Sequence, residues 1–135
     1  MPVRVCFDTS FLMLAAKFHL DVVSEVERLL QRRVEFIVLD IVVAELERLT
    51  SSRGRSGRDA RVALELVAER KMRRIGTVKQ SSADKALIAA SADSDLIVAT
   101  ADLSLRSAIR DADKPVIFFR EKAKLELDGI EAGYW

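Results

Sequence analysis

The chain has 135 residues, half of them hydrophobic, with 22 basic side chains against 21 acidic ones. This length and composition favour a single domain spanning residues 1–135 and exclude a disordered chain, because enough residues can enter a packed core. Asp8 interrupts the first apolar run, and nowhere do eighteen apolar residues follow one another, so we expect neither a signal peptide nor a membrane span. The single cysteine, Cys6, lies in that first run, and we expect it to be a core residue of a cytoplasmic protein.

Strand-like and helix-like segments alternate along the chain. In chain order, we predict a strand at 3–7, a helix at 20–33, a strand at 35–39, helices at 40–50 and 58–71, a weak strand at 73–78, a helix at 82–93, a strand at 96–100, a helix at 103–111 and a strand at 115–119. Nearly continuous hydrophobic strands separated by helices predict a parallel sheet covered on both faces. The expected fold is therefore a three-layer α/β/α sandwich of the doubly wound type.

Positive charge is concentrated in one part of the chain. Residues 48–74 contain nine basic and three acidic side chains, so the rest of the chain has an excess of acids. Within this part, the stretch "TSSRGRSGR" at 50–58 combines glycine, serine and arginine, which predicts an irregular segment. Two interpretations stay open, namely a basic loop that binds a polyanion and a plain surface connection between two helices.

Four acids are placed where they could meet. Asp8 and Asp102 each follow a predicted strand, and open α/β sheets bind their ligands at that carboxyl edge. If the two strands are neighbours, they lie about 5 Å apart and their carboxylates converge. Glu45 borders the buried stripe of the helix after the second strand, and Asp84 occupies the first turn of another helix. We refer to these four residues as the acidic cluster.

Each of these acids also has a simpler explanation. Asp8 and Asp102 could be helix N-caps, and Glu45 could be an ordinary surface residue. Asp84 could form a capping box with Ser81. Gathered at one edge, however, like charges repel one another unless a cation intervenes. Oxygen ligands without histidine or cysteine suit Mg²⁺ or Mn²⁺, so the sequence predicts a site for one of these ions.

The rest of the sequence narrows the chemistry. His19 is the only histidine, which excludes a two-imidazole nuclease and, with one cysteine, a structural zinc site. No glycine-rich phosphate loop follows a strand, and Thr9 and Ser10 stand where a dehalogenase-type phosphatase has a second acid. What remains is metal-assisted hydrolysis of a phosphodiester. The candidates for binding the phosphates of the substrate strand are Arg53, Arg55, Arg58 and Arg61.

Four segments of the chain resemble the acidic motifs of PIN-domain ribonucleases. They are "VCFDTSFLM", "VVAELERL", "SADKALIAASA" and "VATADLSLR", which contain the four acids in order and span nearly the whole chain. The resemblance implies a five-stranded parallel sheet of order 3-2-1-4-5, an Mg²⁺- or Mn²⁺-dependent endoribonuclease, and frequent dimerisation. It also implies that the acidic cluster supplies the metal ligands, and that Thr100 and Ser10 form hydrogen bonds within it.

The chain departs from the PIN pattern at two positions. Many members have asparagine where Ser10 stands, and many have a further acid where this chain has Ser104. Without that acid, catalysis by one metal ion and catalysis by two both stay open. The tail "PVIFFREKAKLELDG" resembles archaeal stand-alone members related to ribosomal-RNA-processing PIN proteins, some of which are toxin ribonucleases.

Several functional alternatives remain at this point. A ribonuclease of this kind could act in RNA processing or as a toxin controlled by an antitoxin protein, and a PIN fold could also bind RNA or protein without turnover. At the C-terminus, Tyr134 and Trp135 could stack on RNA bases, pack across a dimer or fold back on their own subunit. We expect His19 to be a surface or capping residue, and Asp93 and Asp95 to belong to a turn.

Overall fold

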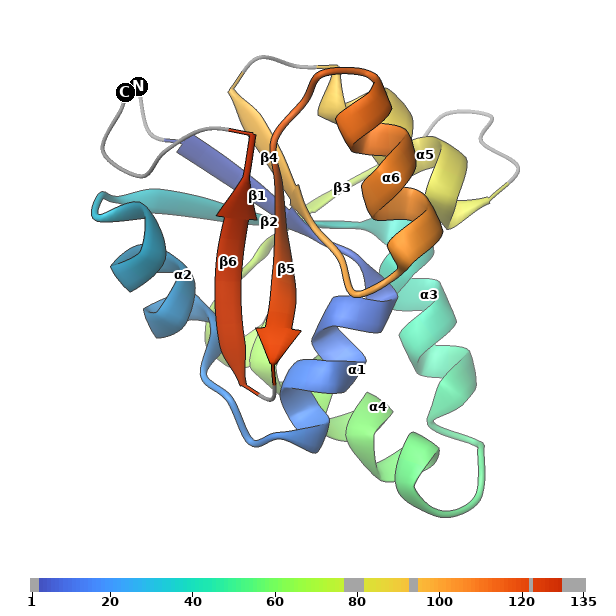
Figure 1. Ribbon diagram of the computed structural model, residues 1–135. Helices are drawn as coiled ribbons and strands as arrows, with labels where there is room; N and C mark the ends of the chain where they lie inside the picture. Colours follow the sequence, from blue (N-terminus) through green and yellow to red (C-terminus); the bar gives the residue numbers. More distant parts are fainter. Residues whose placement is uncertain (1–2, 77–81, 93–94, 122, 130–135) are drawn as a thin grey trace.

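Six strands form one central sheet in the computed structural model, which describes residues 3–76, 82–92, 95–121 and 123–129 (Figure 1). The strands are β1 (Val3–Phe7), β2 (Val34–Leu39), β3 (Arg73–Ile75), β4 (Leu96–Ala99), β5 (Val116–Glu121) and β6 (Lys124–Asp128). Their order in the sheet is β3-β2-β1-β4-β5-β6. At the centre, Phe7 of β1 lies opposite Ala99 of β4 in a parallel pair, so these two strands end side by side.

The first five strands are parallel and follow the predicted order. The sequence analysis did not predict β6, which pairs antiparallel with β5 and extends the implied five-stranded sheet to six strands. Its residues alternate between charged and apolar, and none is fully buried. That pattern differs from the continuous apolar runs by which the parallel strands were recognised, because an antiparallel edge strand needs only one covered face.

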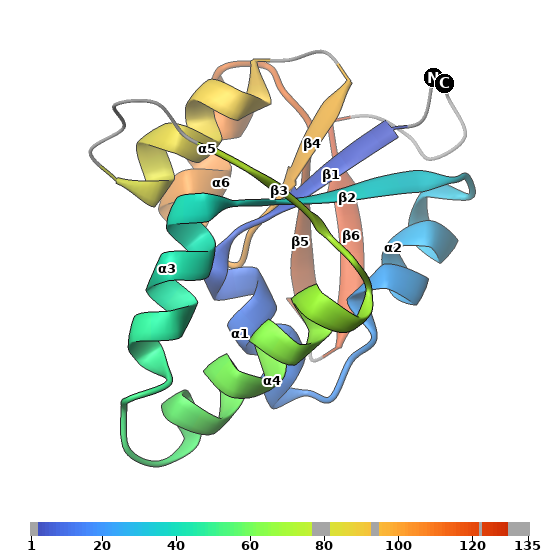
Figure 2. The same cartoon turned by 180° about the vertical axis from the view of Figure 1, so that it is seen from behind.

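Six helices flank the sheet in two groups within the described residues (Figures 1 and 2). On one side, α1 (Thr9–Lys17), α3 (Asp40–Leu49) and α4 (Arg55–Glu69) pack against one another, and α2 (Val22–Leu30) contacts β6. The second group consists of α5 (Ala83–Ser91) and α6 (Leu103–Asp111), which also pack together. The predicted three-layer α/β/α architecture is confirmed.

Helix α1 is an element that the sequence analysis missed. It begins directly after β1, and more than half of its nine residues are buried. Because the segment has no continuous polar face, it lacks the amphipathic period by which the other helices were predicted. The helix begins where Asp8, in an extended conformation, accepts a hydrogen bond from the backbone N–H of Ser10.

Helix α4 begins at Arg55, inside the segment that was predicted to be irregular. The prediction was wrong for the second half of that segment, and the irregular backbone is confined to residues 50–54. Gly54 has a φ of +74°, a conformation that favours glycine. Gly57 approaches the preceding loop so closely that a Cβ at this position would lie 2.1 Å from the backbone oxygen of Ser52. Both glycines therefore serve the turn between α3 and α4.

The end of β1 is fixed by a tightly packed core. Phe7 stacks on Phe11 of α1 and on Phe36 of β2. Cys6 is fully buried and unpaired, as expected for a core residue. Burial, together with the charge of Asp8, raises the pKa of the Cys6 thiol to about 12, so the thiol stays protonated at neutral pH.

Some sequence predictions concern residues outside the described ranges. They are those for Ser81, Asp93, Tyr134 and Trp135. Asp95 does lie in a turn directly before β4, where turn chemistry was expected. No helix in the described part of the chain has the length and apolar character that crossing a membrane requires.

Candidate active site

Asp8 and Asp102 follow the two central strands and lie at the same edge of the sheet. Each is also a helix N-cap, Asp8 for α1 and Asp102 for α6. The Oδ1 atom of Asp102 accepts hydrogen bonds from the backbone N–H groups of Ser104, at 2.8 Å, and Leu105, at 3.2 Å. Asp8 and Asp102 can therefore cap their helices and also follow neighbouring strands, because α1 and α6 begin where β1 and β4 end.

Two hydroxyl groups hold the carboxylate of Asp8, which is only 4% exposed. Its Oδ2 atom accepts hydrogen bonds from the hydroxyl of Ser10, at 2.7 Å, and from the hydroxyl of Thr100. Within the described part of the chain, the hydrogen bond that its Oδ1 atom accepts from the backbone N–H of Ser10 is a long one, 3.4 Å. Oδ1 is therefore the oxygen of Asp8 with the greater capacity to bind a cation.

The same hydroxyls connect Asp8 to the segment after β4. The Thr100 hydroxyl accepts a hydrogen bond from the backbone N–H of Asp102 at 3.0 Å, and the Ser10 hydroxyl accepts one from the backbone N–H of Ala101 at 3.1 Å. These bonds join the ends of β1 and β4 through side chains as well as through the sheet. The separation of the two acids is thereby fixed by the fold.

Replacing the fully buried Thr100 by valine is expected to lower the free energy of unfolding by about 1–3 kcal/mol. Valine keeps the shape of threonine but leaves the backbone N–H of Asp102 without its acceptor and Asp8 without one donor. Thr100→Ser, which keeps the hydroxyl and loses a methyl group, should lose less stability. Urea unfolding measures both variants. A valine variant that equals or exceeds the serine variant in stability would contradict this account of the hydroxyl network.

Glu45 and Asp84 come from the middle of α3 and the first turn of α5. Glu45 is half-buried and forms an ion pair with Arg48, with 3.7 Å between Oε2 and Nη2. Asp84 is exposed, and α5 is capped by Ser82, whose hydroxyl oxygen accepts a hydrogen bond from the backbone N–H of Lys85. Because Lys85 occupies the third helical position, Asp84 does not complete a capping box with Ser82.

The charges of the acidic cluster act on one another. Although Asp84 is largely exposed, partial loss of hydration raises its pKa above the ordinary value, and the negative charges of Asp102, Asp8 and Glu45 raise it further. Asp84 therefore lies within electrostatic range of the other three acids, which come from other elements of the fold. A bound cation would relieve their repulsion.

The donor set of the acidic cluster suits a hydrated hard cation. All its atoms are carboxylate oxygens, the ligands that Mg²⁺ and Mn²⁺ prefer. Among the described residues, however, no three histidine, cysteine, aspartate or glutamate side chains are already arranged to hold a metal ion. Mg²⁺ commonly binds through one or two carboxylates and keeps several waters, so the chemistry fits such an ion without a closed cage of side chains.

The four arginines predicted to bind phosphates divide into two kinds. Arg61 donates a hydrogen bond from Nη1 to the carbonyl oxygen of Thr50 at 3.0 Å, which ties α4 to the end of α3. Arg53, Arg55 and Arg58 are exposed on the turn and on the first helical turn of α4. All four arginines are therefore exposed, and Arg61 has in addition a contact within the fold.

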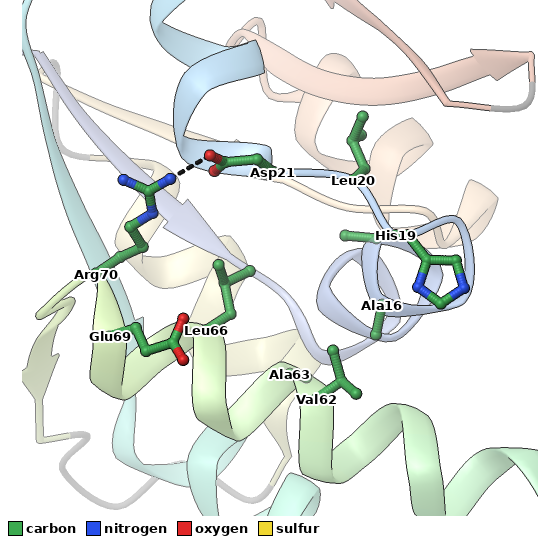
Figure 3. A pocket seen from close by; sticks show the side chains of 10 residues that line it. Ala16, His19, Leu20, Asp21, Val62, Ala63, Leu66, Glu69 and Arg70 are labelled. Atoms are coloured by element: carbon green, nitrogen blue, oxygen red, sulfur yellow. Dashed lines mark hydrogen bonds and ion pairs between the residues drawn. The ribbon is translucent and has the colours of Figure 1, made fainter.

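His19 lies away from the acidic cluster. It is exposed, has a φ of +55° and follows α1 at the rim of a groove of about 310 Å³ between α1 and α4 (Figure 3). The groove floor is mostly apolar, and Asp21 and Arg70 form an ion pair across one end (Figure 3). Burial opposes ionisation of Asp21, but hydrogen bonds from Ser24 and the charge of Arg70 outweigh it and lower the pKa of Asp21. None of the four acids lines this groove.

A different cleft, of about 410 Å³, opens beside Glu45. The described residues that line it are Ile41, Ala44, Glu45, Arg48, Ser82 and Ala83. It therefore lies between α3 and the start of α5, the two helices that carry Glu45 and Asp84. The sequence analysis did not single out Arg48, although its position three residues after Glu45 on a predicted helix would have indicated the contact.

The mostly parallel sheet, the helices on both its faces and the acids Asp8 and Asp102 at its carboxyl edge define an α/β/α domain with acidic residues at one edge. The family model described as the PIN like domain matches residues 5–122, and the chain belongs to this family. Ribonuclease VapC4 of Methanocaldococcus jannaschii is 30% identical over 128 residues, which make up 94% of this chain and 98% of that protein. The resemblance to PIN domains that the four acidic motifs indicate is confirmed.

Two solved structures are similar in fold. The PIN domain endonuclease Utp24 has a TM-score of 0.81 and 24% sequence identity, covering 96% of this chain and 94% of that one. A domain of a functionally unknown protein from Methanocaldococcus jannaschii has a TM-score of 0.59 and 14% identity, covering 88% of this chain and 92% of that one. At these identities the likeness extends to the fold alone.

Proposed function

We propose that this protein is an endoribonuclease that hydrolyses RNA phosphodiester bonds at the acidic cluster with the help of Mg²⁺ or Mn²⁺. The observation that carries the proposal is the placement of Asp8 and Asp102 at one edge of the sheet, where hydrogen bonds through Thr100 join the ends of β1 and β4. Asp84 lies within electrostatic range of both acids and of Glu45. The similarity to ribonuclease VapC4 over almost the whole chain supports RNA as the substrate. The similarity in fold to the PIN domain endonuclease Utp24 agrees with a nuclease.

Asp8, Glu45, Asp84 and Asp102 are the residues that would hold the ion. When bound, such an ion supplies an activated water and offsets charge on the phosphodiester. The chain itself orients two of the proposed ligands. The hydroxyls of Thr100 and Ser10 hold the carboxylate of Asp8. Backbone N–H groups at the start of α6 hold the carboxylate of Asp102. Ser104 stands where many PIN proteins have a further acid, so the proposal requires only one ion.

Cleavage assays with labelled single-stranded and structured RNAs test this proposal. We expect products in the presence of Mn²⁺ or Mg²⁺ and none when EDTA is in excess. Cleavage that persists in the chelator would contradict a metal-dependent nuclease.

A second candidate is a PIN-fold module that binds RNA or protein without turnover. It is favoured by one observation, namely that no three potential ligands in the described part of the chain are arranged as a formed metal site. RNA binding that needs no metal and yields no product under any of the assay conditions would support this candidate over the nuclease.

We propose that the protein acts in the cell either in RNA processing or as a toxin that is controlled by an antitoxin protein. A neighbouring small gene that encodes a DNA-binding partner would favour the toxin role.

We also propose a cytoplasmic homodimer built from one domain over residues 1–135. The match of one family model over residues 5–122 supports a single domain. Sedimentation analysis measures the oligomeric state, and a monomer at all concentrations would contradict the dimer.

Removing Arg53, Arg55 or Arg58 is expected to weaken RNA binding and to leave stability unchanged. Each alanine variant should reduce the dependence of log K on log salt by about 0.7, the value for one phosphate contact on a single strand. Arg61→Ala should instead lower the free energy of unfolding by about 1 kcal/mol, because it removes the bond to the Thr50 carbonyl. Fluorescence anisotropy with labelled RNA and urea unfolding measure the two effects. If all four alanine variants had the same effect on RNA affinity and on the free energy of unfolding, the separate roles assigned to Arg61 and to the other three arginines would be wrong.

A further inference from the structure

Arg48 is the one basic residue among the described residues that line the cleft beside Glu45. Its side chain is 75% exposed, and its guanidinium lies 3.7 Å from the carboxylate of Glu45. This distance exceeds that of a hydrogen bond, and an exposed ion pair of this kind contributes little in water. The guanidinium can therefore exchange this contact for a stronger one.

The position of Arg48 relates the acidic cluster, where RNA would be cleaved, to the exposed arginines that would bind its phosphates. It lies one helical turn beyond Glu45 on α3, toward the turn that presents Arg53, Arg55 and Arg58. The cleft that Arg48 lines also contains Glu45 of the acidic cluster. Near the carboxylates a phosphate is repelled, so a cation is needed to bind one there.

We infer that Arg48 binds a backbone phosphate of the RNA next to the one that is cleaved, with the phosphate seated in the cleft between α3 and α5. The inference rests on the proposed function for the identity of the substrate. Arginine suits this role because its planar guanidinium can donate two parallel hydrogen bonds to phosphate oxygens. On RNA binding, Arg48 exchanges its loose contact with Glu45 for these shorter, charge-assisted bonds.

The alternative is that Glu45 and Arg48 form only a local ion pair on a helix. The chain offers a matched control for that role in Glu25 and Arg28 of α2. This pair has the same spacing, a distance of 3.5 Å and an arginine side chain that is 77% exposed. It lies on a helix that carries no residue of the acidic cluster.

The experiment compares Arg48→Ala, Arg48→Lys and Arg28→Ala with the wild type. Fluorescence anisotropy in EDTA measures the Kd for a labelled single-stranded RNA, and initial rates in Mn²⁺ measure KM and kcat. For Arg48→Ala we expect Kd and KM to rise about tenfold or more with kcat within about twofold, and the salt dependence of Kd to lose about one phosphate contact. Arg48→Lys should recover part of the affinity, and Arg28→Ala should match the wild type.

The outcomes separate the inference from the proposed function. If the wild type cleaves RNA and Arg48→Ala has the same Kd and KM as Arg28→Ala, the inference is wrong and the nuclease proposal stands. If the wild type binds RNA in a manner that depends on Arg48 but never cleaves it, the nuclease proposal is wrong and the phosphate site stands. If the wild type neither binds nor cleaves RNA, both are wrong.

Discussion

Replacing Asp8 by asparagine is expected to lower the rate of RNA cleavage by roughly 10²- to 10³-fold, comparable to the removal of one group that stabilises charge in a transition state. The single side-chain oxygen of asparagine can still accept from the hydroxyls of Ser10 and Thr100, so only the long 3.4 Å bond from the backbone N–H of Ser10 is lost. The fold should therefore persist while the negative charge at the centre of the acidic cluster is lost. Initial rates in Mn²⁺, with circular dichroism to verify folding, measure the effect.

Asp21→Asn is a closely matched control for this substitution. Asp21 caps α2 as Asp8 caps α1, and it accepts from the N–H and the hydroxyl of Ser24 at 3.4 and 2.9 Å. It lies at the groove between α1 and α4, away from the acidic cluster. We expect Asp21→Asn to cleave RNA at the wild-type rate. Equal activity of Asp8→Asn and Asp21→Asn would contradict a catalytic role for the cluster.

Replacing Gly57 by alanine is expected to lower the free energy of unfolding by about 2–4 kcal/mol. The added Cβ would meet the backbone oxygen of Ser52 at 2.1 Å, and a backbone atom cannot turn aside as the end of a side chain can. The loop between α3 and α4 would have to move away from the helix. Urea unfolding of the variant measures the loss.

Gly54→Ala separates this steric effect from backbone strain. A Cβ at Gly54 would meet nothing within 4 Å, but the residue has a φ of +74°. We expect a smaller loss of about 1–2 kcal/mol from strain alone. A Gly57→Ala protein as stable as the wild type, or less affected than Gly54→Ala, would contradict the close approach of α4 to the loop.

The sequence predicted those parts of the fold whose signal is local. Strands such as Val3–Phe7 and Leu96–Ala99 are short apolar runs because both faces of a parallel sheet are covered, and they were identified on that ground. Asp8 and Asp102 could be assigned to the sheet edge because each directly follows such a run. The strand order, in contrast, followed from the resemblance to PIN domains, since the pattern of single strands does not determine which strands become neighbours.

The features that the sequence analysis missed depend on contacts between distant segments. Helix α1 packs against α4 on one side and the sheet on the other, so it has no continuous polar face. Its sequence therefore lacks the amphipathic period by which a helix is recognised. The role of Arg61 depends on the Thr50 carbonyl, and the early start of α4 depends on Gly57 fitting against Ser52. In the acidic cluster, the sharing of Asp8 between two hydroxyls arises because β1 and β4 are adjacent, which only the assembled sheet establishes.

We expect Asp8 and at least one other acid of the cluster, distant along the chain, to bind one cation at the carboxyl edge of the sheet. The anomalous difference map of a crystal soaked in Mn²⁺ tests it most directly. If the proposed metal site is correct, the map has a peak within coordination distance of the Oδ1 atom of Asp8 and of at least one other acid of the cluster. Asp8→Asn crystals should have no such peak. A map without density at the cluster, or with Mn²⁺ bound only elsewhere on the surface, would contradict the account.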